Sequence, residues 1–75
     1  MKKGTKKLAN LEVIGSRVRE LRGEMLQYEL ATYLGISQGQ LSKIERGKLG
    51  PTAEVLLRLA EKFGKSTDWM LTGKS

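Results

Sequence analysis

The 75-residue sequence contains no cysteine and no histidine, and it has only one proline. Without cysteine, neither a disulfide bond nor a thiolate metal site can form. The lack of histidine removes the commonest general base and a frequent metal ligand. A glycine-rich phosphate-binding loop is missing as well. The sequence therefore predicts a protein that is not an enzyme and that needs no metal or other cofactor.

Long apolar runs are also absent, so no segment approaches the length of a membrane span. The basic start, Met-Lys-Lys-Gly-Thr-Lys-Lys, is not followed by an apolar segment, which excludes a secretory signal. We therefore expect a cytoplasmic protein without membrane contact. Its formal net charge of +6 favours polyanionic partners but does not select a fold.

Residues 1–10 contain four lysines, no acidic residue and no helical periodicity. Such a segment is typical of a solvated, flexible tail. A more specific interpretation is a basic arm that settles on phosphates when the domain docks. The two interpretations are compatible, because an arm of this kind would be flexible when the protein is free.

The remaining residues, 11–75, predict one compact all-α domain. Apolar residues recur at helical spacing, as in the first predicted helix with Leu11, Ile14, Val18 and Leu21. Glycines mark the ends of predicted helices, and the residues suited to N-caps are Asn10, Ser37, Thr52 and Ser66. Together they predict five helices, over residues 11–23, 27–34, 37–46, 52–63 and 67–71. Gly15 lies inside the first helix at a cost of about 1 kcal/mol relative to alanine. Either a close approach of another helix or neutral drift would explain it.

The third predicted helix is polar on one side and has a cap at each end. Ser37 is a suitable N-cap with Gln40 as its capping-box partner, and Gly47 suits the C-terminal end. Leu41 and Ile44 form a narrow inward stripe. The opposite face carries cationic and hydrogen-bonding groups and no carboxylate, namely Gly39, Ser42, Lys43 and Arg46. Such a face favours an anionic partner, and DNA is the obvious candidate.

The second and third predicted helices are separated by about three residues that include Gly35. Two helices joined by a short, glycine-containing turn are the signature of a helix-turn-helix. A turn of this length fixes the angle between the helices. One helix can then cross the DNA backbone while the other enters the major groove.

Four segments together resemble the lambda-repressor-like (Xre-type) helix-turn-helix family. They are Ile14–Arg22, Gln27–Ala31, Leu34–Ser37 and Leu41–Gly47, in that order and at nearly the usual spacing. The resemblance implies a five-helix domain whose third helix reads the major groove of double-stranded DNA. It further implies a sequence-specific transcriptional regulator, a repressor, that binds an inverted repeat as a homodimer.

The resemblance also implies roles for individual residues. Gln27, at the start of the second helix, corresponds to a glutamine that hydrogen-bonds a phosphate. Arg22 and Glu45 resemble the internal arginine–glutamate pair of the family, and on a helical wheel both border the core side of their helices. Positions used for base edges and nearby phosphates are occupied by Gln38, Gly39, Gln40, Ser42 and Lys43. Arg46 and Lys48 resemble contacts to the DNA backbone, which fix register without reading sequence.

Three departures from the family pattern stand out. The link between residues 22 and 27 is about two residues shorter than usual. Leu26 occupies the position of a serine or threonine N-cap, a loss of about 1 kcal/mol. Gly39 has no side chain with which to read a base, so it either permits a close backbone approach or is neutral.

A second interpretation is a protein-interaction module, such as an antitoxin that covers a toxin partner. Three consecutive apolar residues near the C-terminus, Trp69, Met70 and Leu71, also indicate a possible contact with a partner. In a helix they cannot all point inward. Part of this group should therefore be exposed or covered by a partner, and whether it forms a homodimer seam stays open.

Overall fold

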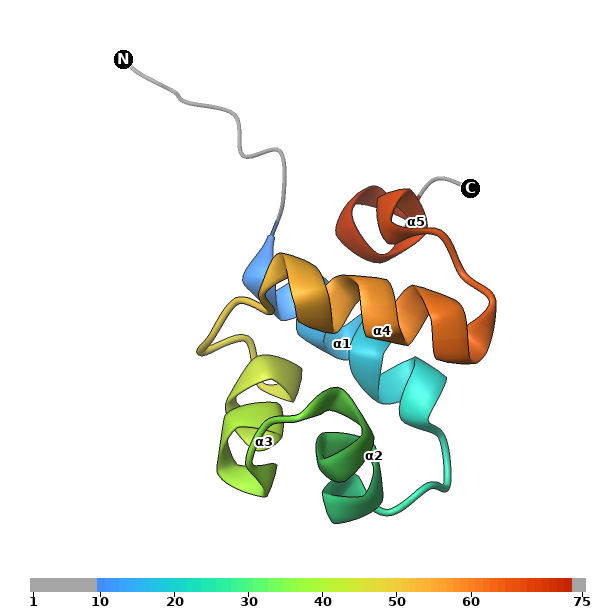
Figure 1. Cartoon of the computed structure of the whole chain (residues 1–75). Coiled ribbons are helices and arrows are strands. Elements are labelled where there is room, and N and C mark those ends of the chain that lie inside the picture. Colours follow the sequence, from blue (N-terminus) through green and yellow to red (C-terminus); the bar gives the residue numbers. More distant parts are fainter. Residues whose placement is uncertain (1–9, 74–75) are drawn as a thin grey trace.

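The computed structural model describes residues 10–73. Within this range the chain forms helices and no strand, as predicted for an all-α domain. The helices are α1 (Leu11–Arg22), α2 (Gln27–Leu34), α3 (Gln38–Glu45), α4 (Ala53–Phe63) and α5 (Thr67–Thr72) (Figure 1). The proposed basic arm lies, apart from Asn10, outside the described residues.

The helices begin where the capping residues predict. The side chains of Asn10, Ser37, Thr52 and Ser66 each accept a backbone N–H from the first turn that follows. Leu26 precedes α2 and offers no such acceptor, as predicted. The carboxylate of Glu29 instead accepts the N–H of Leu26, with 3.3 Å between nitrogen and Oε1. Half of a capping box therefore replaces the missing N-cap.

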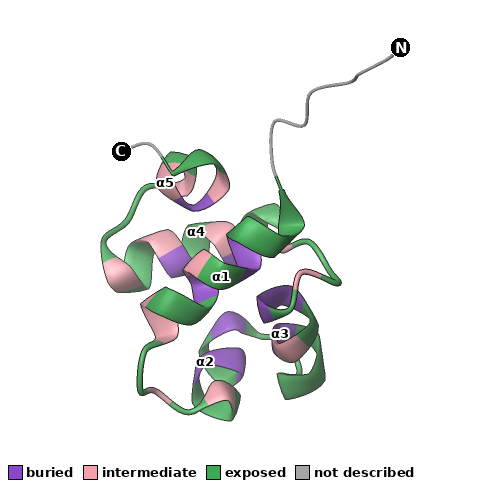
Figure 2. Cartoon of the chain, turned by 180° about the vertical axis from the view of Figure 1, so that it is seen from behind, coloured by how far each residue is buried: buried purple, intermediate pink, exposed green. Residues whose placement is uncertain are grey.

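The core is formed by apolar side chains that all five helices contribute. Its buried members are Ile14, Val18, Leu30, Ala31, Leu34, Leu41, Ile44, Val55, Leu59 and Met70. Figure 2 shows the buried positions in purple on each of these helices. Of the three consecutive apolar residues of α5, Met70 is buried while Trp69 and Leu71 are half-buried, so the prediction that they cannot all point inward is confirmed.

The prediction that Leu11 faces the core with the rest of its apolar stripe is wrong. Leu11 is 42% exposed. It is the first residue of α1, and its Cδ2 would lie 3.2 Å from a Cβ built on Gly50, in the loop before α4. Periodicity identifies the side of a helix that faces the core, but it does not show where the core ends along that helix.

The backbones of α1 and α3 approach each other closely at Gly15. A Cβ on Gly15 would clash with the carbonyl oxygen of Ile44 and lie 2.7 Å from that of Glu45. A second close approach lies nearby, where a Cβ on Gly47 would be 2.8 Å from Cα of Glu12. Of the two explanations for Gly15, close helix approach is therefore confirmed. These contacts fix the end of α3 against α1.

Candidate nucleic-acid interface

Two buried side chains and a capping box fix the position and orientation of α3. Leu41 and Ile44 are buried at 0% and 3% exposure, as the inward stripe predicts. The hydroxyl of Ser37 accepts the N–H of Gln40 at 3.0 Å, and Oε1 of Gln40 accepts the N–H of Ser37 at 2.9 Å. The side chain of Gln40 thus holds the start of α3, which limits its freedom to reach a base.

Glu45 braces the other end of α3 through a buried ion pair. Its side chain is 2% exposed and that of Arg22 is 16% exposed. Nε of Arg22 lies 2.6 Å from Oε2 and Nη2 lies 3.0 Å from Oε1, a two-point arrangement that suits a guanidinium and a carboxylate. The hydrogen bond to Glu45 raises the pKa of Arg22 above its ordinary value. The predicted internal pair is therefore confirmed.

The same pair also determines where the end of α1 lies. Nη1 of Arg22 donates to the carbonyl oxygen of Met25 at 2.8 Å, in the short link between α1 and α2. One guanidinium therefore holds both this link and Glu45 of α3. In the shortened link, Arg22 thus supplies a hydrogen-bond donor to the carbonyl group of Met25.

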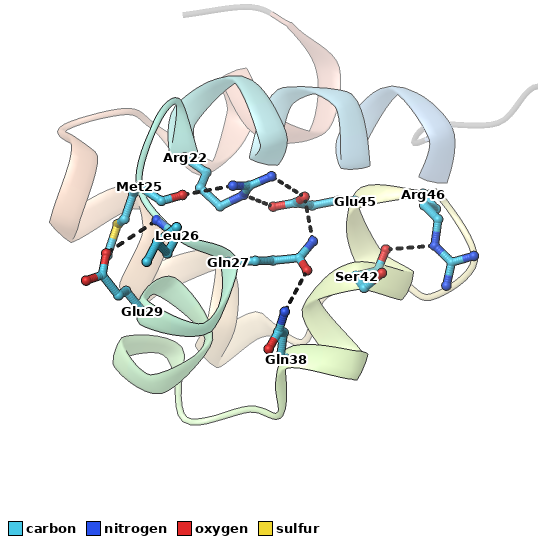
Figure 3. A network of polar contacts seen from close by, with 9 residues as sticks. All are labelled: Arg22, Met25, Leu26, Gln27, Glu29, Gln38, Ser42, Glu45 and Arg46. Carbon is cyan, nitrogen blue, oxygen red and sulfur yellow. Dashed lines mark hydrogen bonds and ion pairs between the residues drawn. The ribbon is translucent and has the colours of Figure 1, made fainter.

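Gln27 and Gln38 extend this network toward the surface (Figure 3). Nε2 of Gln27 donates to Oε1 of Glu45 at 3.0 Å. Nε2 of Gln38 donates to Oε1 of Gln27 at 3.4 Å. The first residue of α2 is thus linked to both ends of α3. The sequence missed the Gln27–Glu45 contact, because it joins residues 18 positions apart and depends on the angle between two helices.

The outer face of α3 and the loop after it present only positive charges. Lys43, Arg46 and Lys48 are exposed, whereas Ser42 is half-buried. Nε of Arg46 donates to the carbonyl oxygen of Ser42 at 3.4 Å. Glu45 is the only acidic residue between positions 36 and 50, and it is paired inside the protein. An anion that approaches this face meets no exposed carboxylate of α3.

Gly39 lies on the same outer face, one residue after Gln38. The nearest atom to a Cβ built there is Oγ of Ser37, at 3.8 Å. The backbone of Gly39 has no positive φ. The fold itself therefore does not require glycine at this position, in contrast to Gly15 and Gly47.

The predicted site residues come from two helices that pack against each other, α2 and α3, and from the residues that follow α3. Gln27 is the first residue of α2, the predicted residues from Gln38 to Lys43 lie in α3, and Arg46 and Lys48 follow the last residue of α3. Glutamine amides and lysine ammonium groups are suited to read base edges in the major groove.

In the described range of residues, no helix is long and apolar enough to cross a membrane. Nor does that range hold a group of three or more potential metal ligands.

The chain is similar to known helix-turn-helix proteins. A family model described as Helix-turn-helix matches residues 17–70. An uncharacterized HTH-type transcriptional regulator, y4dJ of Sinorhizobium fredii, is 39% identical over 57 residues, which cover 73% of this chain and 74% of that protein.

Two solved structures are similar as well. The P22 c2 repressor in complex with a synthetic operator superposes with a TM-score of 0.76 at 31% identity, covering 83% of this chain and 97% of that one. An addiction module antidote protein of the HigA family from Coxiella burnetii superposes with a TM-score of 0.67 at 28% identity, covering 81% and 70%.

Proposed function

Because the chain belongs to the Helix-turn-helix family, in its lambda-repressor-like (Xre) form, we propose that it is a sequence-specific DNA-binding transcriptional regulator, a repressor. The observation that carries this proposal is the outer face of α3. Together with the loop after it, this face presents the exposed Gln38 and Gln40 and three cations, and the neighbouring carboxylate of Glu45 is buried in an ion pair. This face enters the major groove, and α2 lies across the DNA backbone.

The contacts divide into two kinds. Gln38, Ser42 and Lys43 point from α3 toward base edges and read sequence, with Gly39 beside them. Arg46 and Lys48, at the end of α3 and in the loop after it, bind phosphates and fix the register. Gln27 contacts a phosphate at the start of α2, where the helix dipole favours an anion. Gln40 acts mainly through the N-terminal cap of α3.

Two lysines test this division of roles. Lys43→Ala should relax base preference at one position of each half-site, whereas Lys48→Ala should weaken binding to all sequences alike. Lys62→Ala is a matched control, because this exposed lysine lies in the last turn of α4, outside the proposed DNA-binding face and the α5 contact, and its ammonium group packs over the ring of Tyr33. Affinities for a set of single-base operator variants at one salt concentration provide the measurement. Equal losses for Lys43→Ala and Lys48→Ala on every sequence would refute the division.

The proposal includes a homodimer on an inverted repeat, with half-sites about one helical turn apart. The half-buried Trp69 and Leu71 of α5 are candidates for the contact between the two copies. A DNA-binding role of this kind is exerted in the cytoplasm and requires no catalytic residue. Sedimentation with and without operator DNA measures the number of copies bound.

A second candidate function is an antitoxin that covers a toxin partner. The similarity to the HigA-family antidote protein supports it, although the repressor similarity is closer in both identity and TM-score. The two candidates differ in a simple observation. An antitoxin copurifies from its natural host with a small protein at fixed stoichiometry, and a repressor without such a partner does not.

A further inference from the structure

We propose that the exposed backbone at Gly39 admits the C5 substituent of a pyrimidine, so that methylation or hydroxymethylation of a cytosine at that position strengthens binding. The inference rests on the proposed function, because it assumes that α3 lies in the major groove. It assigns to Gly39 a ligand of defined chemistry, namely a pyrimidine that carries a methyl or hydroxymethyl group at C5.

Gly39 occupies the line of α3 that lies farthest from the core. Successive residues of an α-helix are about 100° apart, which places Gly39 about 170° from the midpoint between Leu41 and Ile44. Those two side chains are buried and hold α3 against the domain. Position 39 therefore faces most directly outward, and there the helix surface consists of backbone alone.

The fold does not require a glycine at this position. The backbone of Gly39 has no positive φ, and glycine is less favourable than alanine in a helix. Apart from its two chain neighbours, the nearest heavy atom to a Cβ built on Gly39 is Oγ of Ser37, at 3.8 Å. Room for a side chain is thus present and unused, and it is available to a group that approaches from outside.

The side chains that flank Gly39 are engaged in hydrogen bonds within the protein. Nε2 of Gln38 donates to Oε1 of Gln27 at 3.4 Å, toward the start of α2 (Figure 3). Oε1 of Gln40 accepts the N–H of Ser37 at 2.9 Å, toward the start of α3. These bonds direct the two amides to the starts of α2 and α3 and leave position 39 between them.

The C5 position of a pyrimidine is suited to this room. Thymine presents a methyl group at C5 in the major groove, and methylation or hydroxymethylation of cytosine adds a group at the same ring position. A side chain at position 39 would compete with that group for space. Ser42 and Lys43, one turn further along the same face, carry hydrogen-bond donors. The oxygen of a hydroxymethyl group therefore meets donors, whereas a methyl group gains only from burial.

The experiment compares operators that differ only in the group at C5. Bound sequences are first selected from random DNA with the wild type. At each pyrimidine position of the enriched operator, in both half-sites, bases with hydrogen, methyl or hydroxymethyl at C5 are then placed in turn. A uracil series and a cytosine series are used, each with its matching partner base, so that thymine and modified cytosine are tested separately.

Three variants are measured on the same operators, after circular dichroism has established that each is folded. Gly39→Ala and Gly39→Val fill the room at position 39 to two different extents. Lys48→Ala is the matched control, because it removes a proposed phosphate contact in the loop after α3 and leaves position 39 unchanged.

Burial of one methyl group corresponds to about fourfold in affinity. At one position of each half-site, we expect the wild type to prefer methyl over hydrogen by about fourfold per half-site, in both series. The hydroxymethyl form should bind at least as tightly as the methyl form. Gly39→Ala should lose more than half of this preference, and Gly39→Val should prefer hydrogen. Lys48→Ala should bind every form more weakly with the wild-type ratios.

If no position favours a C5 substituent, or if Gly39→Ala and Gly39→Val keep the wild-type ratios, the inference is wrong although the proposed function stands. Weaker binding of hydroxymethylcytosine than of cytosine at the responding position would contradict it as well. If the wild type enriches no sequence at all, the proposed function fails and this inference fails with it.

Discussion

Replacement of Gly15 by alanine tests the feature that positions α3. In an isolated helix this change stabilises by about 1 kcal/mol, because alanine is the better helix former. In this domain the added Cβ meets two backbone carbonyl oxygens of α3, those of Ile44 and Glu45. A side chain could rotate away from the new methyl group, but a helix backbone has to move as a unit. Gly15→Ala should therefore destabilise this domain, which is the reverse of its effect in an isolated helix.

The magnitude follows from the same contact. The Cβ would lie 2.7 Å from the oxygen of Glu45 and nearer still to that of Ile44, so α1 and α3 have to move apart to restore ordinary contact distances. Overpacking of a core costs about 1–3 kcal/mol, and the upper end applies here because backbone is displaced. After the gain in helix propensity, a net loss of about 2 kcal/mol remains. For a domain of this size the melting temperature falls by about 8–16 °C.

Gly39→Ala is the matched control. It makes the same chemical change in a helix, but a Cβ there has its nearest neighbour at 3.8 Å. This variant should be as stable as the wild type, or more stable by up to about 1 kcal/mol. Thermal unfolding followed by circular dichroism gives both values. A Gly15→Ala protein that melts at or above the wild-type temperature would refute the close approach of α1 and α3.

Three further predictions concern stability and binding. Ser37→Ala removes the N-cap of α3 and should lower the free energy of unfolding by about 1 kcal/mol, measured in urea. Glu45→Ala leaves the Arg22 guanidinium without its carboxylate, and we expect the free energy of unfolding to fall by about 3–5 kcal/mol, the cost of breaking a buried pair. A fall of less than about 1 kcal/mol would show that the pair does not stabilise the position of α3. If a dimer neutralises about eight phosphates, the logarithm of the operator affinity should fall with log salt at a slope near −7, and a slope near zero would argue against the basic interface.

Features that depend on neighbours in the chain were predictable from the sequence. The caps Asn10, Ser37, Thr52 and Ser66 bond to groups two or three residues away, so their residue types are sufficient to identify them. Glycine after α2 has a φ of 74°, a left-handed conformation that few other residues adopt. The five helices therefore begin and end within a residue or two of the predicted limits.

Features that depend on the packing of helices were predictable only in part. The Arg22–Glu45 pair was predicted because both residues border the core side of their helices and resemble a family pair. The bond from Gln27 to Glu45 was not, since it requires the distance between the start of α2 and the end of α3. The same holds for Arg17, whose Nη1 donates to the carbonyl oxygen of Met70 at 3.1 Å and holds α5 against α1.

The most direct test of the central claim is selection of bound sequences from random double-stranded DNA by the full chain, at one stated salt concentration. The proposed function predicts an enriched inverted repeat, with half-site centres about one helical turn apart. It also predicts that Lys43→Ala loses preference at one position of each half-site while Lys48→Ala retains the whole motif. Recovery of no enriched sequence by the folded wild-type protein would contradict the claim that α3 reads DNA.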